Sequence, residues 1–371
     1  MSPSFAARIL TGNRIAAVLY FLLSAYVFGI WVWSADTKPD AFNADPQSRI
    51  SDIIYGRAHR PYVQRALIPI ITRTVRGAIP DAAADSLSAR AQRMPKVREE
   101  LERLHWEGGF LSEYLIALAL AFASLLAFAF TVRALWTTFY ETDRWITNAV
   151  PLAALLLLPP IFPTGPHYIY DFPALLLFTL GLVALLQRRW LLYYPVLAIG
   201  LLNKETMVLL PLLFILLNRH RLRSRAVLLH IAAQGGIFLA IKFAIAAAFA
   251  GNPGNTMDFH LFANVDILLR GYGIGALLVI GAFAGLLLHD WRHKHPDLKI
   301  AALLIIPMLL LLFWGGIITE LRDLYELFPI VLILSLHTIL FSTMKIRYRH
   351  SLPASDIPYA DRRPHIRPTS T

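Results

Sequence analysis

Four aspartates fall within seventeen positions near the start of the chain, and they are the first candidates for chemistry. A carboxylate within hydrogen-bond reach of a hydroxyl can act as a general base while that hydroxyl attacks an electrophilic carbon. Asp40 and Asp45 are the favoured candidates for this catalytic role, with Asp36 and Asp52 as alternatives. Aspartates in a proline-containing loop also form turns and helix caps, so a structural role competes at each position.

A basic stretch, RPYVQRALIPIITR, follows the aspartates. On a helical wheel Arg65, Arg73 and Arg76 share one side, which predicts a helix lying in the membrane interface with a basic stripe. Guanidinium groups bind phosphate through several hydrogen bonds at once. We expect Arg60 and Arg65, together with Lys204, to hold a lipid phosphate. Nonspecific binding of bulk headgroups is the alternative.

Lys204 and Glu205 interrupt the apolar run LLNKETMVLLPLL. The apolar segments on either side, 190–202 and 206–217, would form helices of roughly 18 to 20 Å, shorter than a hydrocarbon core of about 30 Å. Their junction should therefore lie in a recess, because exposed charge and non-helical backbone are costly in lipid. The alternative is that the two charges only neutralise each other.

Two further polar groups flank apolar segments, in HYIYDF and in ELRDLYE. Tyrosine, histidine and carboxylate side chains can bind sugar hydroxyls and ring faces, although interfacial tyrosines also serve as membrane anchors. Acidic and basic side chains three residues apart can equally form a local network. The predicted substrate-binding residues are His167, Tyr168, Tyr170, Asp171, Glu205, Glu320, Arg322 and Asp323.

The elements that would position these residues are apolar. Of 371 residues, 57% are hydrophobic and 16% charged, which is typical of a polytopic integral membrane protein. We expect an all-α fold with about ten transmembrane helices, including short paired helices and amphipathic helices in the first outer loop. The predicted spans are 15–34, 111–135, 147–163, 171–187, 190–202, 206–217, 226–250, 267–289, 300–318 and 325–344.

Basic residues cluster in the loops at 187–189, 218–225 and 289–299 and in the C-terminal tail, and the positive-inside rule assigns these to the cytoplasm. Both termini are then cytoplasmic, and the candidate residues face the other side. The predicted organisation is a cytoplasmic N-terminus with the first helix, an outer loop with interfacial helices, a transmembrane bundle and a basic, disordered tail, at 1–34, 35–110, 111–344 and 345–371 respectively.

The chain resembles the GT-C class of polytopic glycosyltransferases, particularly the bacterial group that uses polyprenyl-phosphate sugars. The resemblance lies in a long acidic loop after the first helix and in the stretches RPYVQRALIPIITR, HYIYDFPALLLFTLGL and LLNKETMVLLPLLF. The resemblance implies a lipid-linked sugar donor, a glycan or lipid acceptor, an outer-loop carboxylate as base, basic residues on the leaving phosphate, and a site on the outer face of the inner membrane. No adjacent acidic pair occurs in the cluster, so the resemblance does not choose among the aspartates.

Two other functions compete with sugar transfer. A transporter or flippase for lipid-linked glycans also uses interrupted helices around charged residues, but it predicts an internal repeat, which is not detected. A noncatalytic subunit of an envelope polysaccharide assembly system predicts that no single carboxylate is essential. The net charge of +11 lies mostly in loops and tail and no nucleic-acid motif accompanies it, so we expect lipid contacts and no nucleic-acid partner. The chain has no cysteine and no HExxH spacing, so neither pattern indicates a metal site. A divalent metal ion as cofactor stays an open alternative.

Overall fold

The computed structural model describes residues 14–35, 43, 45–256, 259–271, 274–341 and 347–348, with the backbone alone at 274–277, 279 and 347–348. The predictions for Asp36 and Asp40 lie outside the described residues. So does the prediction of a disordered tail, apart from the two residues that form strand β2, Arg347–Tyr348. This strand pairs antiparallel with β1, Tyr140–Glu141, and every other described element is helical.

Five helical segments are long and apolar enough to cross a bilayer. They are α2 (Arg14–Ser34), α7 with its preceding turn η2 (Gly108–Phe139), α8 with η3 (Arg144–Thr164), α12 (Ser224–Ala248) and α15 with α16 (Pro296–Gly315). Four shorter apolar segments join them: α9 (Asp171–Leu186), α10 (Trp190–Asn203), η4 with α11 (Glu205–Asn218) and α17 (Phe328–Phe341). The helical architecture is compatible with a polytopic membrane protein, while the count of ten spans stays a prediction.

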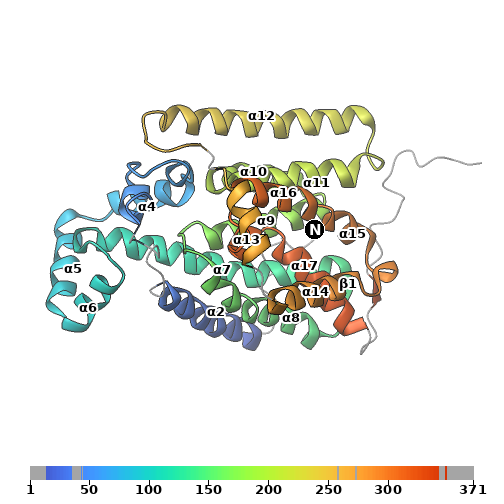
Figure 1. The fold of residues 1–371 in the computed structure, drawn as a ribbon, viewed down its shortest axis with the longest axis horizontal. Helices are drawn as coiled ribbons and strands as arrows, with labels where there is room; N and C mark the ends of the chain where they lie inside the picture. The colour runs from blue at the N-terminus through green and yellow to red at the C-terminus, as the bar shows by residue number, and fades with distance from the viewer. Residues whose placement is uncertain are drawn as a thin grey trace, which may run out of the picture.

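Helix α7 lies at the centre of the bundle, between α2, α4, α8 and α9 (Figure 1). Its side chains Phe128 and Trp136 are completely buried, as is Phe178 of α9. Large apolar side chains elsewhere point outward, including Leu191, which is 96% exposed, and Leu229 of α12. An apolar interior with an equally apolar outer surface is expected when lipid surrounds the helices.

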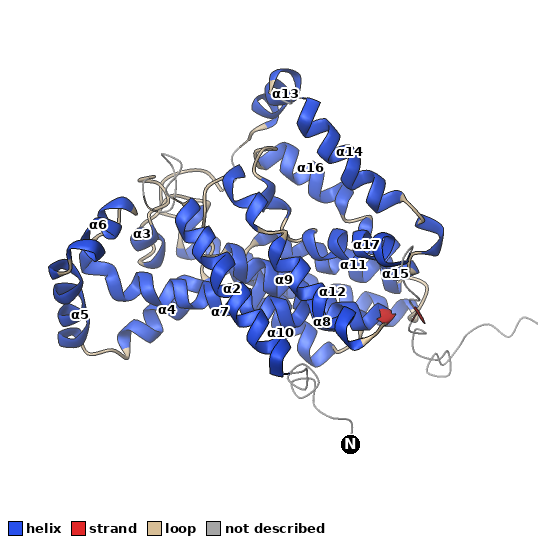
Figure 2. Cartoon of the chain, turned by 90° about the horizontal axis from the view of Figure 1, so that it is seen from below, coloured by secondary structure: helices blue, strands red, loops and turns tan. Residues whose placement is uncertain are grey.

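The described part of the segment between α2 and α7 contains four α-helices, which lie at one end of the bundle (Figures 1 and 2). They are α3 (Ile50–Ile54), α4 (Leu67–Gly77), α5 (Asp81–Arg93) and α6 (Pro95–Arg103), with the short turn η1 (Tyr62–Gln64) before α4. We call this end of the bundle the loop end. It also receives the start of α9 and the junction of α10 with η4, whereas β1 and α15 lie at the opposite end.

One buried carboxylate ties these loop helices to α7. Glu113, in the first turn of α7, accepts hydrogen bonds from Tyr55 at 2.5 Å and from Ser112 at 2.7 Å. The Nε atom of Arg76 on α4 lies 3.6 Å from the same carboxylate. Burial and this carboxylate together raise the pKa of Tyr55 to about 12, so its hydroxyl remains a donor. The loop end is therefore anchored to the bundle by a polar contact at the start of its central helix.

The predicted span at 267–289 is instead divided between two helices. Helix α13 (Leu261–Arg270) ends before Gly271, and α14 (Ile274–Leu288) begins after it. Asn264 explains why α13 belongs with α16, since its amide donates to the carbonyls of Phe313 and Gly316, each at 2.8 Å. These carbonyls would otherwise lack partners at the end of α16. The hydropathy of 267–289 did not reveal this break because α13 also carries apolar residues.

Candidate functional site

Charged and aromatic side chains from four distant segments meet at the loop end. Their segments are the turn after η1, the start of α9, the junction of α10 with η4, and the region around η6 (Leu321–Leu324) before α17. We call this group the charged cluster. Its members are Arg65, Tyr168, Tyr170, Asp171, Lys204, Glu205, Thr206, Glu320, Arg322, Asp323 and Glu326.

Lys204 lies where the helix is interrupted, with extended backbone between α10 and η4. Its ammonium nitrogen is 3.3 Å from a carboxylate oxygen of Glu326 and 3.8 Å from one of Asp323. Lys204 is 4% exposed and Glu326 is fully buried, so each requires the other's charge. Thr206 also donates its hydroxyl to Glu326. The interruption thus places a lysine where carboxylates from the far end of the sequence can reach it.

Arg65 follows η1 and pairs with Glu205. One guanidinium nitrogen lies 3.5 Å from the Glu205 carboxylate, and another donates to the hydroxyl of Tyr170. Burial alone would lower the pKa of Arg65, but the Tyr170 hydroxyl and the Glu205 carboxylate raise it, so the guanidinium stays charged. Lys204 and Glu205 therefore do not simply neutralise each other, because each has a separate partner.

Arg322 connects the η6 region to the start of α9. Its guanidinium lies 3.7 Å from Asp171 and 3.5 Å from Asp323, and it also donates to Glu320. Burial by itself disfavours an ionised Asp323, but Arg322 and Lys204 hold the pKa of its carboxyl below the ordinary value. Asp323 is thus ionised at neutral pH, and its side chain is 22% exposed.

Two tyrosines form the aromatic part of the cluster. The rings of Tyr168 and Tyr170 stack with centroids 5.0 Å apart and planes within 6° of parallel. The guanidinium carbon of Arg322 is 4.5 Å from the Tyr168 centroid, and that of Arg65 is 4.4 Å from the Tyr170 centroid. Cation–π contacts of this kind are strongest where water is excluded. Each ring of the stack thus contacts one of the two arginines.

Carboxylates outnumber cations in the charged cluster. Its cations are Arg65, Lys204 and Arg322, and its carboxylates are Asp171, Glu205, Glu320, Asp323 and Glu326. An added phosphate would have to replace one of these carboxylates. Glu205 is the most readily displaced, since its side chain is 44% exposed and its contact with Arg65 is long.

The aspartate-rich loop has a different environment. Asp45 accepts hydrogen bonds from the backbone nitrogen of Gln47 at 2.9 Å and the hydroxyl of Ser48 at 3.0 Å, which is the geometry of a turn. Asp52 lies 3.1 Å from the Nε atom of Arg57. Among the described residues, no hydrogen bond or ion pair joins either aspartate to the charged cluster. Both aspartates thus make local structural contacts, and a catalytic role for either stays a prediction.

The remaining predicted site residues make contacts that connect distant segments of the chain. His167 lies 3.0 Å from the hydroxyl of Ser34 and packs against Trp31, so it joins α2 to the turn before α9. The backbone nitrogen of Arg60 donates to the carbonyl of Pro253 at 2.9 Å, which ties the first outer loop to the loop after α12. The predicted basic stripe loses Arg65, which precedes α4, while Arg73 and Arg76 lie on that helix. Arg76 binds Asp81 and Glu113.

Sequence reasoning did not select Glu326 or Thr206. Glu326 was noted only as the end of ELRDLYE, yet it is the buried counter-charge of Lys204. An available signal was a carboxylate directly before the apolar run of α17, since a charge in that position needs a partner. The identity of the partner could not be inferred without the fold, because more than a hundred residues separate them.

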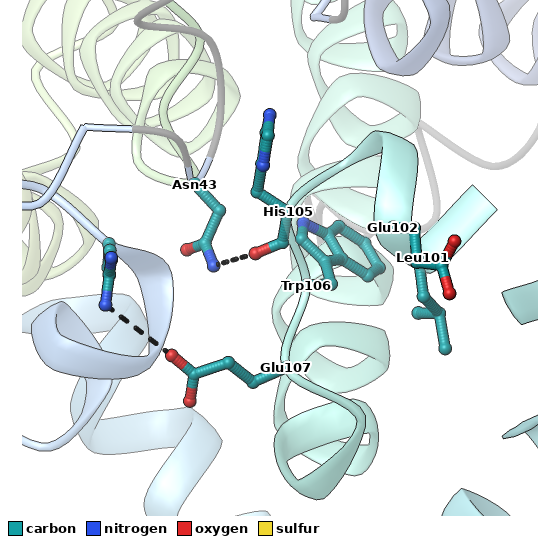
Figure 3. Close-up of a pocket in the computed structure, with 7 residues that line it drawn as sticks. Asn43, Leu101, Glu102, His105, Trp106 and Glu107 are labelled. Atoms are coloured by element: carbon teal, nitrogen blue, oxygen red, sulfur yellow. Dashed lines mark hydrogen bonds and ion pairs between the residues drawn. The ribbon is translucent and has the colours of Figure 1, made fainter. Parts of the chain in front are cut away.

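Two hollows lie near the loop end. The first, of about 260 Å³, is lined by side chains of α6 and the following turn, including His105, Trp106 and Glu107 (Figure 3). Asn43 closes one side by donating to the His105 carbonyl at 2.7 Å. The second, of about 220 Å³, lies against α12 and includes Gln64 and Lys242. In the described part of the chain, no group of three or more His, Asp or Glu side chains is arranged to hold a metal ion.

Comparison of the chain with protein-family models, curated proteins and solved structures yields no match. The charged cluster is thus interpreted from its own chemistry.

Proposed function

We propose that the protein is a membrane glycosyltransferase that moves a sugar from a polyprenyl-phosphate donor to a lipid or glycan acceptor at the outer face of a bacterial inner membrane. The observation that carries the proposal is the charged cluster, which joins cations able to face a phosphate and ionised carboxylates able to face a hydroxyl. The resemblance of the sequence pattern to GT-C enzymes supports the same reaction.

The reaction requires removal of a proton from the acceptor hydroxyl and stabilisation of negative charge on the leaving phosphate. The acceptor oxygen forms a bond to the sugar C1, the bond from C1 to the phosphate oxygen breaks, and its electron pair leaves with the phosphate. A carboxylate takes the acceptor proton, and cations stabilise the growing negative charge on the phosphate. Asp323 suits the first task among the described residues, because it is ionised and partly exposed. Asp40 remains the alternative base on the acidic loop.

Arg65 suits the second task. Its partner Glu205 is partly exposed and could be replaced by a phosphate oxygen, which would keep the guanidinium paired throughout the reaction. Lys204 lies deeper, beside Glu326 and Asp323, where it can stabilise charge without direct contact. The stacked tyrosines would keep Arg65 and Arg322 from moving apart during the exchange.

The test is a transfer assay with the purified full chain. Candidate polyprenyl-phosphate sugars and acceptors are incubated with the protein, and products are identified by mass spectrometry. We expect transfer to fall at least about 100-fold in the variant that lacks the base, either Asp323→Asn or Asp40→Asn. Asp81→Asn is the control, because Asp81 is 88% exposed. Absence of transfer with every donor, or unchanged transfer in both variants, would overturn the proposal.

A transporter for lipid-linked glycans is the second candidate, favoured by the interruption between α10 and α11 around a buried lysine. It predicts movement of an intact lipid-linked glycan across vesicles that contain the protein, without a transfer product. Detection of a transfer product instead would favour the enzyme.

A further inference from the structure

Helix α12 carries a lysine deep in an apolar, outward-facing segment. Lys242 lies six residues before the end of α12 at Ala248, about 9 Å along the helix axis. Its neighbours Phe243 and Leu239 are 71% and 52% exposed, as expected for side chains that face lipid. A charge at such a position is costly unless it has a partner or reaches water.

Lys242 lacks a close counter-charge within the protein. It forms no ion pair within 4.0 Å with any residue that the structure describes. Glu205 attracts it at longer range, but the nearest cation to that carboxylate is Arg65. The ammonium therefore lies beside the charged cluster without belonging to its ion pairs.

The 220 Å³ hollow provides space for a partner. Its walls are apolar, formed by Leu239, Phe243 and Ile245, while Lys242, Gln64 and Thr256 supply the polar groups. Such a hollow suits a molecule with an apolar chain and a charged end. Because the Lys242 ammonium has no ion pair within 4.0 Å among the described residues, we expect the charged end of that molecule to be negative.

Contacts outside the hollow hold α12 against the rest of the protein. The side-chain amide of Asn252, just after α12, donates to the carbonyls of Gly56 and Ala58, each at 2.9 Å. The backbone contact between Arg60 and Pro253 adds to this tie. Further along α12, the Tyr193 hydroxyl donates to Gln234 at 2.7 Å and holds the helix against α10. Helix α12 runs along the edge of the bundle (Figure 1). These contacts hold it before and after residues 239–246, the part of the helix that lines the hollow.

We propose that this hollow binds the phosphate end of an anionic lipid that enters from the bilayer, with Lys242 as the residue that binds the phosphate. The apolar walls contact the first part of the lipid chain, and Gln64 supplies a neutral hydrogen-bond donor. A bound lipid phosphate would lie next to Arg65 and Glu205, so the hollow would lead from the membrane to the charged cluster. This binding does not depend on sugar transfer and would stand without it.

Native mass spectrometry of the full chain in detergent tests the proposal. The probes are a polyprenyl monophosphate, phosphatidylglycerol, a neutral diacylglycerol and inorganic phosphate, each titrated against the protein. We expect Lys242→Met to weaken binding of the anionic lipids about tenfold or more, and Lys242→Arg to preserve it. Lys96→Met, an identical change on the exposed surface of α6, should leave binding unchanged.

The outcomes separate the ligand sources and the two proposals. Preference for the polyprenyl monophosphate over phosphatidylglycerol identifies the donor type of lipid, and the reverse identifies a membrane phospholipid. Equal binding of neutral and anionic lipids, unchanged binding in Lys242→Met, or binding of inorganic phosphate as tight as that of the lipids would overturn the inference. If the protein transfers sugar but Lys242→Met does not weaken lipid binding, the inference about the hollow is wrong and the proposed function is unaffected.

Discussion

Removal of the Lys204 charge should destabilise the protein far more than removal of an exposed charge. In Lys204→Met the side chain keeps its approximate volume, but Glu326 is left buried and without its cation. At an effective dielectric constant of about 20, contacts at 3.3 Å and 3.8 Å correspond to roughly 5 and 4 kcal/mol of gross attraction. Desolvation offsets much of this, and loss of one partner of a buried pair typically costs about 3–5 kcal/mol.

Arg98→Met provides the matched control. Arg98 and Glu102 on α6 form an ion pair at a comparable distance, 3.6 Å, but both side chains are largely exposed. Exposed pairs contribute less than about 1 kcal/mol. The difference between the two variants therefore measures burial, since the charge removed and the new side chain are of the same kind.

Reversible unfolding in mixed micelles, followed by tryptophan fluorescence, gives the free energies, provided the transition is two-state. We expect Lys204→Met to lose about 3–5 kcal/mol. The double variant Lys204→Met with Glu326→Gln should recover more than half of that loss, because the isolated buried charge is removed. If Lys204→Met unfolds at the same denaturant concentration as Arg98→Met, the buried ion pair does not contribute as argued.

Two further changes test other parts of the structure. The pKa of the Asp323 carboxyl is held below its ordinary value, so its contribution to stability should be constant above the unfolded-state pKa of about 3.9. That contribution should be lost as the pH falls through the lower folded-state pKa. The stability difference between the wild type and Asp323→Asn, measured from pH 8 to pH 3, should therefore decrease only in the acidic part of that range. Gly254 has φ of +85°, and a β carbon there would lie 2.6 Å from the Arg60 carbonyl oxygen. Gly254→Ala should therefore lower the free energy of unfolding by about 1–3 kcal/mol. Gly251→Ala is the control and should be nearly neutral, because nothing lies within 4 Å of a β carbon at that position.

Much of the helical organisation could be predicted because lipid imposes a simple pattern. Segments such as α2 and α12 are read directly from apolar runs of sufficient length. The junction at Lys204 was also predicted, since two apolar segments too short to span a bilayer meet at a charged pair, which favours a break in the helix there. The break at Gly271 was not predicted, because it depends on hydrogen bonds from Asn264 to a helix about fifty residues away.

The candidate site could be predicted only in its residues, not in its pairings. Lys204, Glu205 and Arg65 were all selected, but Glu205 was the one partner within the chain considered for Lys204, whereas the fold pairs Lys204 with Glu326. Such partners are set by long-range packing, which no local pattern encodes. The acidic loop illustrates the opposite case: the Asp45 turn follows from local chemistry, and the candidate base Asp40 lies outside the described residues.

The central claim is that the charged cluster opens to the outer face of the membrane and receives the lipid-linked donor. The chain has no cysteine, so a single introduced cysteine can be labelled without background. Asp323→Cys, in intact cells, should react with a membrane-impermeant maleimide and be protected by a polyprenyl-phosphate sugar, while Arg223→Cys, in the basic loop before α12, should react only after the membrane is opened. Labelling of Asp323→Cys only after opening would contradict the account.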